Sequence, residues 1–273
     1  MRKQTRPSSS ARKQGSPRRT NNRYTQSRLS PRSKSSSTLS QLVGDSSPPP
    51  CSSPGKARIG GIRKSTLTDQ IKFVKARTSL GALTPKLACE DEGGTVEAAS
   101  AAWVNIADAS GYWAQMGWSR ERSAGSTTIT RFVYLELTYF DSVNNKPDRL
   151  FQRRQDPGEG SKEYRIELDQ PTGTWHFYFD GNELTFDNYP EEAKYTWKRN
   201  YGSEAKWCGE IWDLNSHMPG VVINKCVFVN CSFKQPGDLF WEDANFDYFT
   251  PQPSTNYTSR IDDATTLEVW DLR

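Results

Sequence analysis

The sequence contains little histidine, no long apolar run and none of the familiar catalytic motifs. GxSxG, HExxH, phosphate-loop and dinucleotide-binding patterns are absent, and a Ser-His-Asp or Cys-His system would have to use one of only two histidines, His176 and His217. His176 is expected on the solvent side of a strand and His217 in a turn. No apolar run approaches the ~18 residues of a membrane span, so no membrane-spanning segment is expected. We expect no cofactor, and the N-terminus shows no secretory signal.

The five cysteines do not follow a metal-binding pattern. They include no CxxC pair, and two histidines are too few to complete a zinc site with them, so no metal is expected. Cys226 and Cys231 are separated by an odd offset that directs them to opposite faces of a continuous strand, so a bond between them would need a bulge. Cys208 could meet either of them across a sheet. The pairing and the redox compartment therefore stay open.

Charge is divided unevenly along the chain. Residues 1–79 contain 18 Lys and Arg and two acidic residues, a net charge of +16, whereas the remaining residues have a net charge of −12. Residues 1–55 consist mostly of Ser, Arg, Lys and Pro, with almost nothing apolar to bury, so we expect this basic tail to be disordered. Its charge favours an acidic partner, which could be a nucleic acid or the chain's own acidic domain.

The rest of the chain divides into a transition and a domain. Residues 56–95 are expected to form a linker with a short helix or strand. Residues 96–273 contain short segments rich in β-branched and aromatic residues, separated by Gly, Asn, Asp and Pro. Several segments alternate with a period of two, and Asp180-Gly181-Asn182 is typical of a hairpin turn. This region predicts an all-β domain, an antiparallel two-sheet β-sandwich of the jelly-roll or concanavalin-like kind.

Two polar residues lie among tryptophans in segments that are predicted to be strands. Gln115 lies between two tryptophans in GYWAQMGW, and Glu210 lies between two in KWCGEIW. A carboxylate flanked by large rings is partly desolvated, which raises its pKa and suits it to general acid or base catalysis. A neutral amide beside it can donate a hydrogen bond to a developing oxyanion. The alternation is equally compatible with two outward-facing residues that have no catalytic role.

The segments YWAQMGW and AKWCGEIWD resemble the active-site strands of the glutamic peptidases, the eqolisin family. Residues 113–118 are similar to that family's apolar-apolar-Gln-small-Gly-aromatic segment, and residues 205–210 are similar to its Ala-x-aromatic-x-x-Glu strand. Further segments agree in order, namely SAAWVNI with Trp103, FVYLEL with Glu136, and INKCVFVNCSF. The resemblance spans residues 98–235 and rests on the order of five short segments. A broader set of sandwich proteins with a Gly-Glu-x-x-aromatic-Asp and a Met-Pro-Gly signature is also similar.

The resemblance implies a two-sheet sandwich that hydrolyses a polypeptide substrate in acid without a cofactor. It implies that Glu210 activates water as general base and then protonates the leaving amine, while the Gln115 amide stabilises the tetrahedral intermediate. It further implies four substrate-binding residues, Trp103, Trp118, Glu136 and Trp207. Members of the family are secreted, so the chain would be secreted if the resemblance holds and cytoplasmic otherwise.

Two other classes of protein share these features. A basic arm ahead of a jelly roll is typical of small-virus coat proteins, in which the arm neutralises nucleic acid; Tyr24 is the only aromatic residue in the arm, so base reading is not expected there. A lectin-like module would stack exposed Trp and Tyr against sugar rings, and the chain has nine Trp. A cleft that holds both Gln115 and Glu210 would favour the enzyme.

Overall fold

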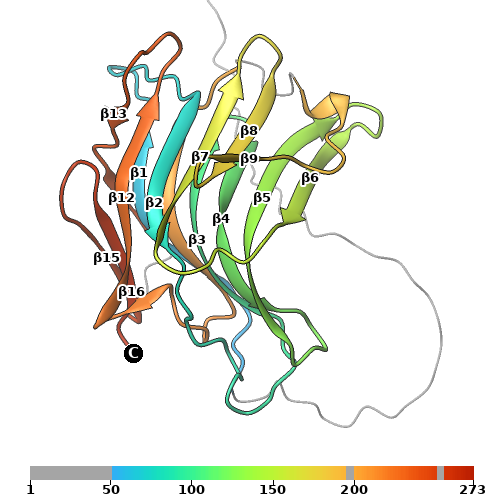
Figure 1. The fold of residues 1–273 in the computed structure, drawn as a ribbon, viewed down its shortest axis with the longest axis vertical. Coiled ribbons are helices and arrows are strands. Elements are labelled where there is room, and N and C mark those ends of the chain that lie inside the picture. Colours follow the sequence, from blue (N-terminus) through green and yellow to red (C-terminus); the bar gives the residue numbers. More distant parts are fainter. Residues whose placement is uncertain (1–50, 195–199, 251–254) are drawn as a thin grey trace, which may run out of the picture. The chain divides into compact units, whose positions relative to one another are not determined.

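The computed structural model of the chain describes residues 51–194, 200–250 and 255–273. Regular structure in this part consists of β-strands in two sheets that pack face to face, together with the short 3-10 helix η1, Glu191–Ala193 (Figure 1). The predicted all-β two-sheet sandwich is confirmed. The tail that was predicted to be disordered lies outside the described residues, apart from residues 51–55. No helix in the described part is long and apolar enough to cross a membrane.

One sheet has seven strands in the order β14-β1-β10-β3-β4-β5-β6, and every neighbouring pair is antiparallel. Its strands are β1 (Lys56–Lys64), β3 (Ala98–Ala107), β4 (Trp113–Arg122), β5 (Ile129–Asp141), β6 (Lys146–Arg153), β10 (Glu204–Trp212) and β14 (Asp247–Phe249). The registers between β10, β3, β4 and β5 run without a bulge. They therefore fix which side chains are neighbours across the sheet.

The other sheet has nine strands in the order β15-β16-β11-β12-β2-β7-β8-β9, with β13 paired to β12. Its strands are β2 (Lys75–Gly81), β7 (Ser161–Asp169), β8 (Thr174–Phe179), β9 (Asn182–Leu184), β11 (Gly220–Val221), β12 (Asn224–Lys234), β13 (Glu242–Asp243), β15 (Tyr257–Ile261) and β16 (Leu267–Asp271). The predicted turn connects β8 and β9, with φ of 50° at Asp180 and 82° at Gly181. Positive φ at both central residues is what a two-residue type I′ hairpin turn requires.

The core lies between the two sheets and is rich in aromatic side chains. Trp118 and Trp207 of the seven-stranded sheet are fully buried there, as are Phe177 and Phe228 of the nine-stranded sheet. The Trp207 indole Nε1 donates a hydrogen bond of 2.9 Å to the Arg77 carbonyl oxygen, which belongs to the other sheet. Burial of a large ring together with a satisfied indole N–H accounts for tryptophan at this position.

Residues 56–95, which were expected to form a linker with a short helix or strand, contain two integral strands of the sandwich. β1 pairs with β10 on one side and β14 on the other, and β2 pairs with both β12 and β7. The sandwich therefore begins at Lys56 rather than at residue 96. β1 was difficult to predict because its segment KARIGGIRK is rich in glycine and charge. Gly60 is required there, since a Cβ at this position would lie 2.1 Å from the Trp207 carbonyl oxygen.

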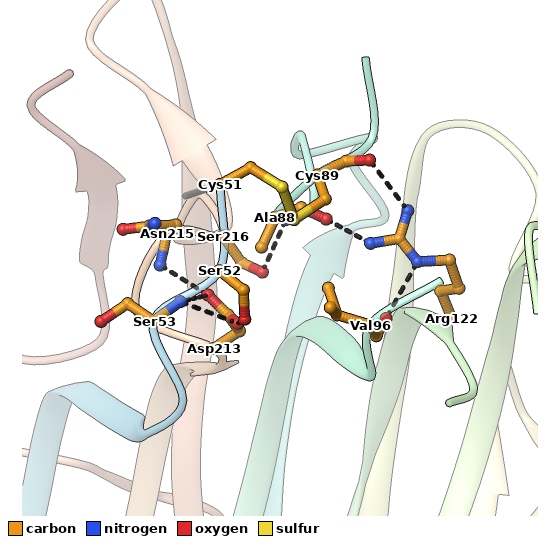
Figure 2. The surroundings of a disulfide bond; sticks show 10 residues. All are labelled: Cys51, Ser52, Ser53, Ala88, Cys89, Val96, Arg122, Asp213, Asn215 and Ser216. Atoms are coloured by element: carbon orange, nitrogen blue, oxygen red, sulfur yellow. Dashed lines mark hydrogen bonds between the residues drawn. A yellow bond between two sulfur atoms is a disulfide. The ribbon is translucent and has the colours of Figure 1, made fainter. Parts of the chain in front are cut away.

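A disulfide between Cys51 and Cys89 ties the end of the basic segment to the loop that precedes β3 (Figure 2). Next to it, the Ser52 hydroxyl donates to Asp213 Oδ2 at 2.6 Å, and the Ser53 amide donates to Asp213 Oδ1 at 3.0 Å. Asp213 directly follows Trp212, the last residue of β10. Residues 51–55 are thus bonded to the sandwich, although they were predicted to belong to the disordered tail.

The other three cysteines, Cys208, Cys226 and Cys231, are free and buried. β12 does have an irregularity between Val229 and Ser232, in the segment where a bond between Cys226 and Cys231 would need a bulge. Despite this irregularity, Cys226 and Cys231 are not bonded to each other. The sequence left the pairing open because no spacing rule relates Cys51 to Cys89 before the fold is known.

Candidate functional site

A cleft of about 200 Å³ lies on the face of the seven-stranded sheet that is turned away from the core. Alternation along the strands creates this face, because successive side chains of a strand point to opposite sides. In β4, Gln115 and Ser119 line the cleft, whereas Met116 and Trp118 point into the core. The ionisable and amide side chains at the cleft are Lys56, Arg58, Gln115, Glu121, Tyr134, Glu136, Arg149 and Glu210.

Glu210 is a buried carboxylate, 4% exposed, that accepts from three donors. The indole Nε1 of Trp103 donates to Oε2 at 3.0 Å, and that of Trp212 donates to Oε1 at 3.1 Å. The Arg58 guanidinium lies 2.9 Å from Oε1, and β1 brings it there because Arg58 is the register partner of Glu210. Burial acts to lower the pKa of Arg58, yet the charge and hydrogen bond of Glu210 raise it, so Arg58 stays charged.

Gln115 lies in the same cleft, 7% exposed, with both ends of its amide engaged. Its Nε2 donates to the Tyr134 hydroxyl at 2.8 Å, and its Oε1 accepts from Asn105 Nδ2 at 3.3 Å. Gln115 does not lie beside Glu210. Register partners on neighbouring strands form a row across the sheet, here called a rung. On this face, the rung of Trp103, Gly117 and Tyr134 lies between the rung that contains Gln115 and the rung that contains Glu210.

Glu136 is a second buried carboxylate at the cleft. It is the register partner of Gln115, accepts from Trp113 Nε1 at 3.1 Å, and lies 2.8 Å from Arg149 Nε. Burial raises the pKa of Glu136, and the negative charge of Glu210 adds to this, although Arg149 and the Trp113 indole oppose the shift. Burial also raises the pKa of Glu121, which pairs with Arg153 on the same face. The cleft therefore contains two carboxyl groups, Glu121 and Glu136, whose pKa values are raised by burial although an arginine faces each of them, and perturbed pKa values are common at catalytic sites.

Tyr134 lies in the rung between Gln115 and Glu210, and its hydroxyl is neutral. Burial raises its pKa well above the usual value, and the charges of Glu210 and Glu136 act in the same direction. Its ring stacks on Phe151, with centroids 5.5 Å apart and an interplanar angle of 27°. The fixed ring and the neutral oxygen make this O–H a directed hydrogen-bond donor at the cleft.

The structure brings four of the six predicted site residues together and separates the other two. Gln115, Glu210, Trp103 and Glu136 line the cleft or bond to its carboxylates. Trp118 and Trp207, expected to bind substrate, are instead 0% exposed in the core between the sheets. The physical reason is parity, because each lies an odd three positions from its polar neighbour and so points to the opposite face.

Several residues of the cleft were missed by sequence reasoning. Trp113 and Trp212 are each two positions from a polar residue of the site, so the same parity rule would have selected them. Arg58 lies in the segment that was expected to be a linker. Tyr134 and Arg149 become neighbours of the site only through the register of β4 with β5 and of β5 with β6.

Neither histidine lines the cleft. His176 contacts Glu183 on the exposed face of the nine-stranded sheet, as its alternation predicted, and burial lowers the pKa of His217 in the segment between β10 and β11. Within the described residues, no group of three or more His, Cys, Asp and Glu is placed to hold a metal ion. A comparison with models of known protein families found no match, and a comparison with curated proteins found none either.

Proposed function

We propose that the chain is a glutamic-type endopeptidase that hydrolyses polypeptides in acid. The observation that supports this most directly is the environment of Glu210, a buried carboxylate held by two indoles and Arg58 in a cleft that also contains Gln115. A fixed, partly desolvated carboxylate is the group that general base catalysis needs. The resemblance of both strands to the glutamic peptidases supports the same assignment.

In this proposal Glu210 takes a proton from the attacking water, and the hydroxide adds to the carbonyl carbon of the scissile peptide. The carbonyl oxygen becomes an oxyanion, which accepts hydrogen bonds from neutral donors on the Gln115 side of the cleft. The carbon–nitrogen bond then breaks, and Glu210 returns its proton to the leaving amine. A carboxylic acid and an amine result, and Glu210 regains its ionised form.

The pKa of Glu136 supports activity in acid. Because burial raises this pKa, Glu136 binds a proton at a higher pH than an exposed glutamate does. Protonation removes one negative charge from a cleft in which an oxyanion must form. The proposed oxyanion is therefore opposed by fewer charges as the pH falls.

The shape of the cleft suits an extended chain. A neighbouring hollow shares five lining residues with the cleft, Ala99, Glu121, Arg149, Phe151 and Trp212, so the groove continues along the sheet. A continuous groove can hold residues on both sides of a scissile bond. The disulfide between Cys51 and Cys89 is in keeping with maturation in an oxidising compartment, as expected for a secreted peptidase.

A second candidate is carbohydrate binding, which the aromatic rim of the cleft favours. Trp113 and Trp212 are partly buried at the cleft, and Phe151 is 37% exposed there. Such rings can stack against the apolar faces of sugars. In this reading Glu136 and Glu210 would accept hydrogen bonds from sugar hydroxyls rather than activate water.

The proposal is tested by cleavage of a denatured protein by the purified chain across pH 2–7. We compare the wild type with the variants Glu210→Gln and Gln115→Ala. Glu204→Gln is the matched control, because Glu204 lies on the same strand but does not line the cleft. Loss of a general base typically lowers the rate by about 10²–10⁴-fold.

We expect cleavage in the acid range, a loss of that size in Glu210→Gln, and wild-type rates in Glu204→Gln. Cleavage that survives in Glu210→Gln would exclude the assigned base. A folded wild type that cleaves nothing at any pH but binds an oligosaccharide through the cleft would favour the carbohydrate reading.

A further inference from the structure

Tyr134 lies in the rung between that of Glu210 and that of Gln115, and its hydroxyl borders the cleft. Tyr134 belongs to the rung of Trp103 and Gly117, with the rung of Gln115 and Glu136 on one side and that of Glu210 on the other. Both carboxylates are close enough to affect its pKa. Because Gly117 carries no side chain, nothing from β4 stands between Tyr134 and Trp103 on this face. Along the strands on this face, a substrate carbonyl beside Glu210 would therefore lie one rung from Tyr134 and two rungs from Gln115.

The direction of the hydrogen bond between the two residues assigns their roles. Gln115 Nε2 donates to the Tyr134 oxygen, so that oxygen is the acceptor and its own proton is directed elsewhere. The amide oxygen of Gln115 is in turn fixed by Asn105 Nδ2. The phenol ring is fixed by stacking on Phe151. Gln115 and Phe151 together hold Tyr134 in one orientation, as preorganised donation to an oxyanion requires.

We infer that the Tyr134 hydroxyl is the hydrogen-bond donor to the carbonyl oxygen of the scissile peptide, and that Gln115 is a positioning residue that orients it. This inference rests on the proposed peptidase function. Tyr134 keeps its proton throughout, because the hydroxyl donates a hydrogen bond and transfers nothing. As the water oxygen adds to the carbonyl carbon, the π electrons move to the carbonyl oxygen, whose hydrogen bond to Tyr134 becomes stronger.

The test is a double-mutant cycle on kcat and KM with one peptide substrate, using Tyr134→Phe, Gln115→Met and the double variant. Removal of one oxyanion donor lowers kcat by about 10²–10³-fold, so we expect this loss in Tyr134→Phe with KM nearly unchanged. Gln115→Met should lose less, because the donor remains but is less well oriented. The double variant should be no slower than Tyr134→Phe alone, since Gln115 has no role once the hydroxyl is gone.

The double variant also guards against a folding defect. Tyr134→Phe leaves Gln115 Nε2 without its partner, whereas replacing both partners with apolar groups of similar shape is nearly neutral for stability. Tyr139→Phe is the matched control: Tyr139 is buried on the same strand, faces the core and donates to Asp148. We expect that control to keep wild-type kcat.

Two results would overturn the inference while leaving the proposed function standing. One is an active wild type whose kcat is unchanged in Tyr134→Phe. The other is a double variant whose loss equals the product of the two single losses, because Gln115 would then act on the substrate independently. An inactive, folded wild type would refute the proposed function and the inference together.

Discussion

Replacing both Cys51 and Cys89 with serine should lower the free energy of unfolding by several kilocalories per mole. The bond joins residues that are 38 positions apart, and this segment contains β1 of one sheet and β2 of the other. For a loop of this length, the chain-entropy relation predicts about 4 kcal/mol of stabilisation through the unfolded state. Typical domains are stable by only about 5–15 kcal/mol, so this one bond is a large share of the total.

The loss is measured by urea unfolding, with tryptophan fluorescence as the signal. For an m-value of about 2–3 kcal/mol/M, the midpoint should fall by about 1–2 M. Adding a dithiol reductant to the wild type should give a similar fall and should not affect the serine variant, since its other cysteines are already free. A fall of less than about 1 kcal/mol in the serine variant would refute the reasoning from loop closure.

The native state adds a local contribution to this effect. Ser52 and Ser53 bond to Asp213, which directly follows Trp212 of the cleft, and Figure 2 shows these contacts beside the disulfide. A loss clearly greater than about 4 kcal/mol would therefore indicate that these contacts are lost together with the bond. Asp213→Asn in the wild-type background separates the two contributions.

Two further predictions concern the cleft. Gly117→Ala should lower the free energy of unfolding by about 1–3 kcal/mol, because the added Cβ would lie 2.0 Å from the Ala102 carbonyl oxygen. Gly81→Ala is the control, since the nearest atom to its added Cβ is 3.6 Å away, and this variant should be neutral or slightly stabilised. Equal urea midpoints for the two variants would contradict this prediction. Burial raises the pKa of Glu136 above 4.5, so between that pH and its folded pKa the folded state binds more protons than the unfolded state, and stability falls as pH rises. Urea unfolding should show that, from pH 4 to pH 7, the free energy of unfolding of the wild type falls relative to that of Glu136→Gln. If the free energy of the wild type relative to the variant is constant or rises with pH, titration of Glu136 is not the cause.

Alternation and turn chemistry were sufficient to predict a two-sheet sandwich, but not to predict every segment that forms one of its strands. The alternation in β7 and the Asp180-Gly181 turn act within a few residues, so they are visible in the sequence. β1 is different, since its glycines are there to let β10 and Phe246 approach closely. A strand whose residues are selected by the partner it touches has no signal of its own, and residues 56–95 were expected to form a linker for that reason.

The candidate site shows the same division between local and long-range information. Gln115 and Glu210 stand out in the sequence because each is polar among aromatics, but which aromatics accompany them depends on strand parity, so Trp118 and Trp207 were assigned to the wrong face. Arg58 and Tyr134 reach Glu210 and Gln115 only through strand pairing, which no local pattern encodes.

The register also explains how the cleft can be hollow in a closely packed sheet. On β4 the small residues Ser119 and Gly117 occupy the rung of Glu210 and the rung between it and that of Gln115, and on β3 the small residue Ala101 is the register partner of Glu210, with Trp103 in the intervening rung. The larger side chains on this face, Trp113, Phe151 and Trp212, stand around them. Small residues in the floor and large residues at the rim leave room above the sheet, and the Glu210 carboxylate and the Tyr134 hydroxyl both border that space. In the proposed chemistry, the scissile peptide bond would have to lie in this space between Glu210 and Gln115.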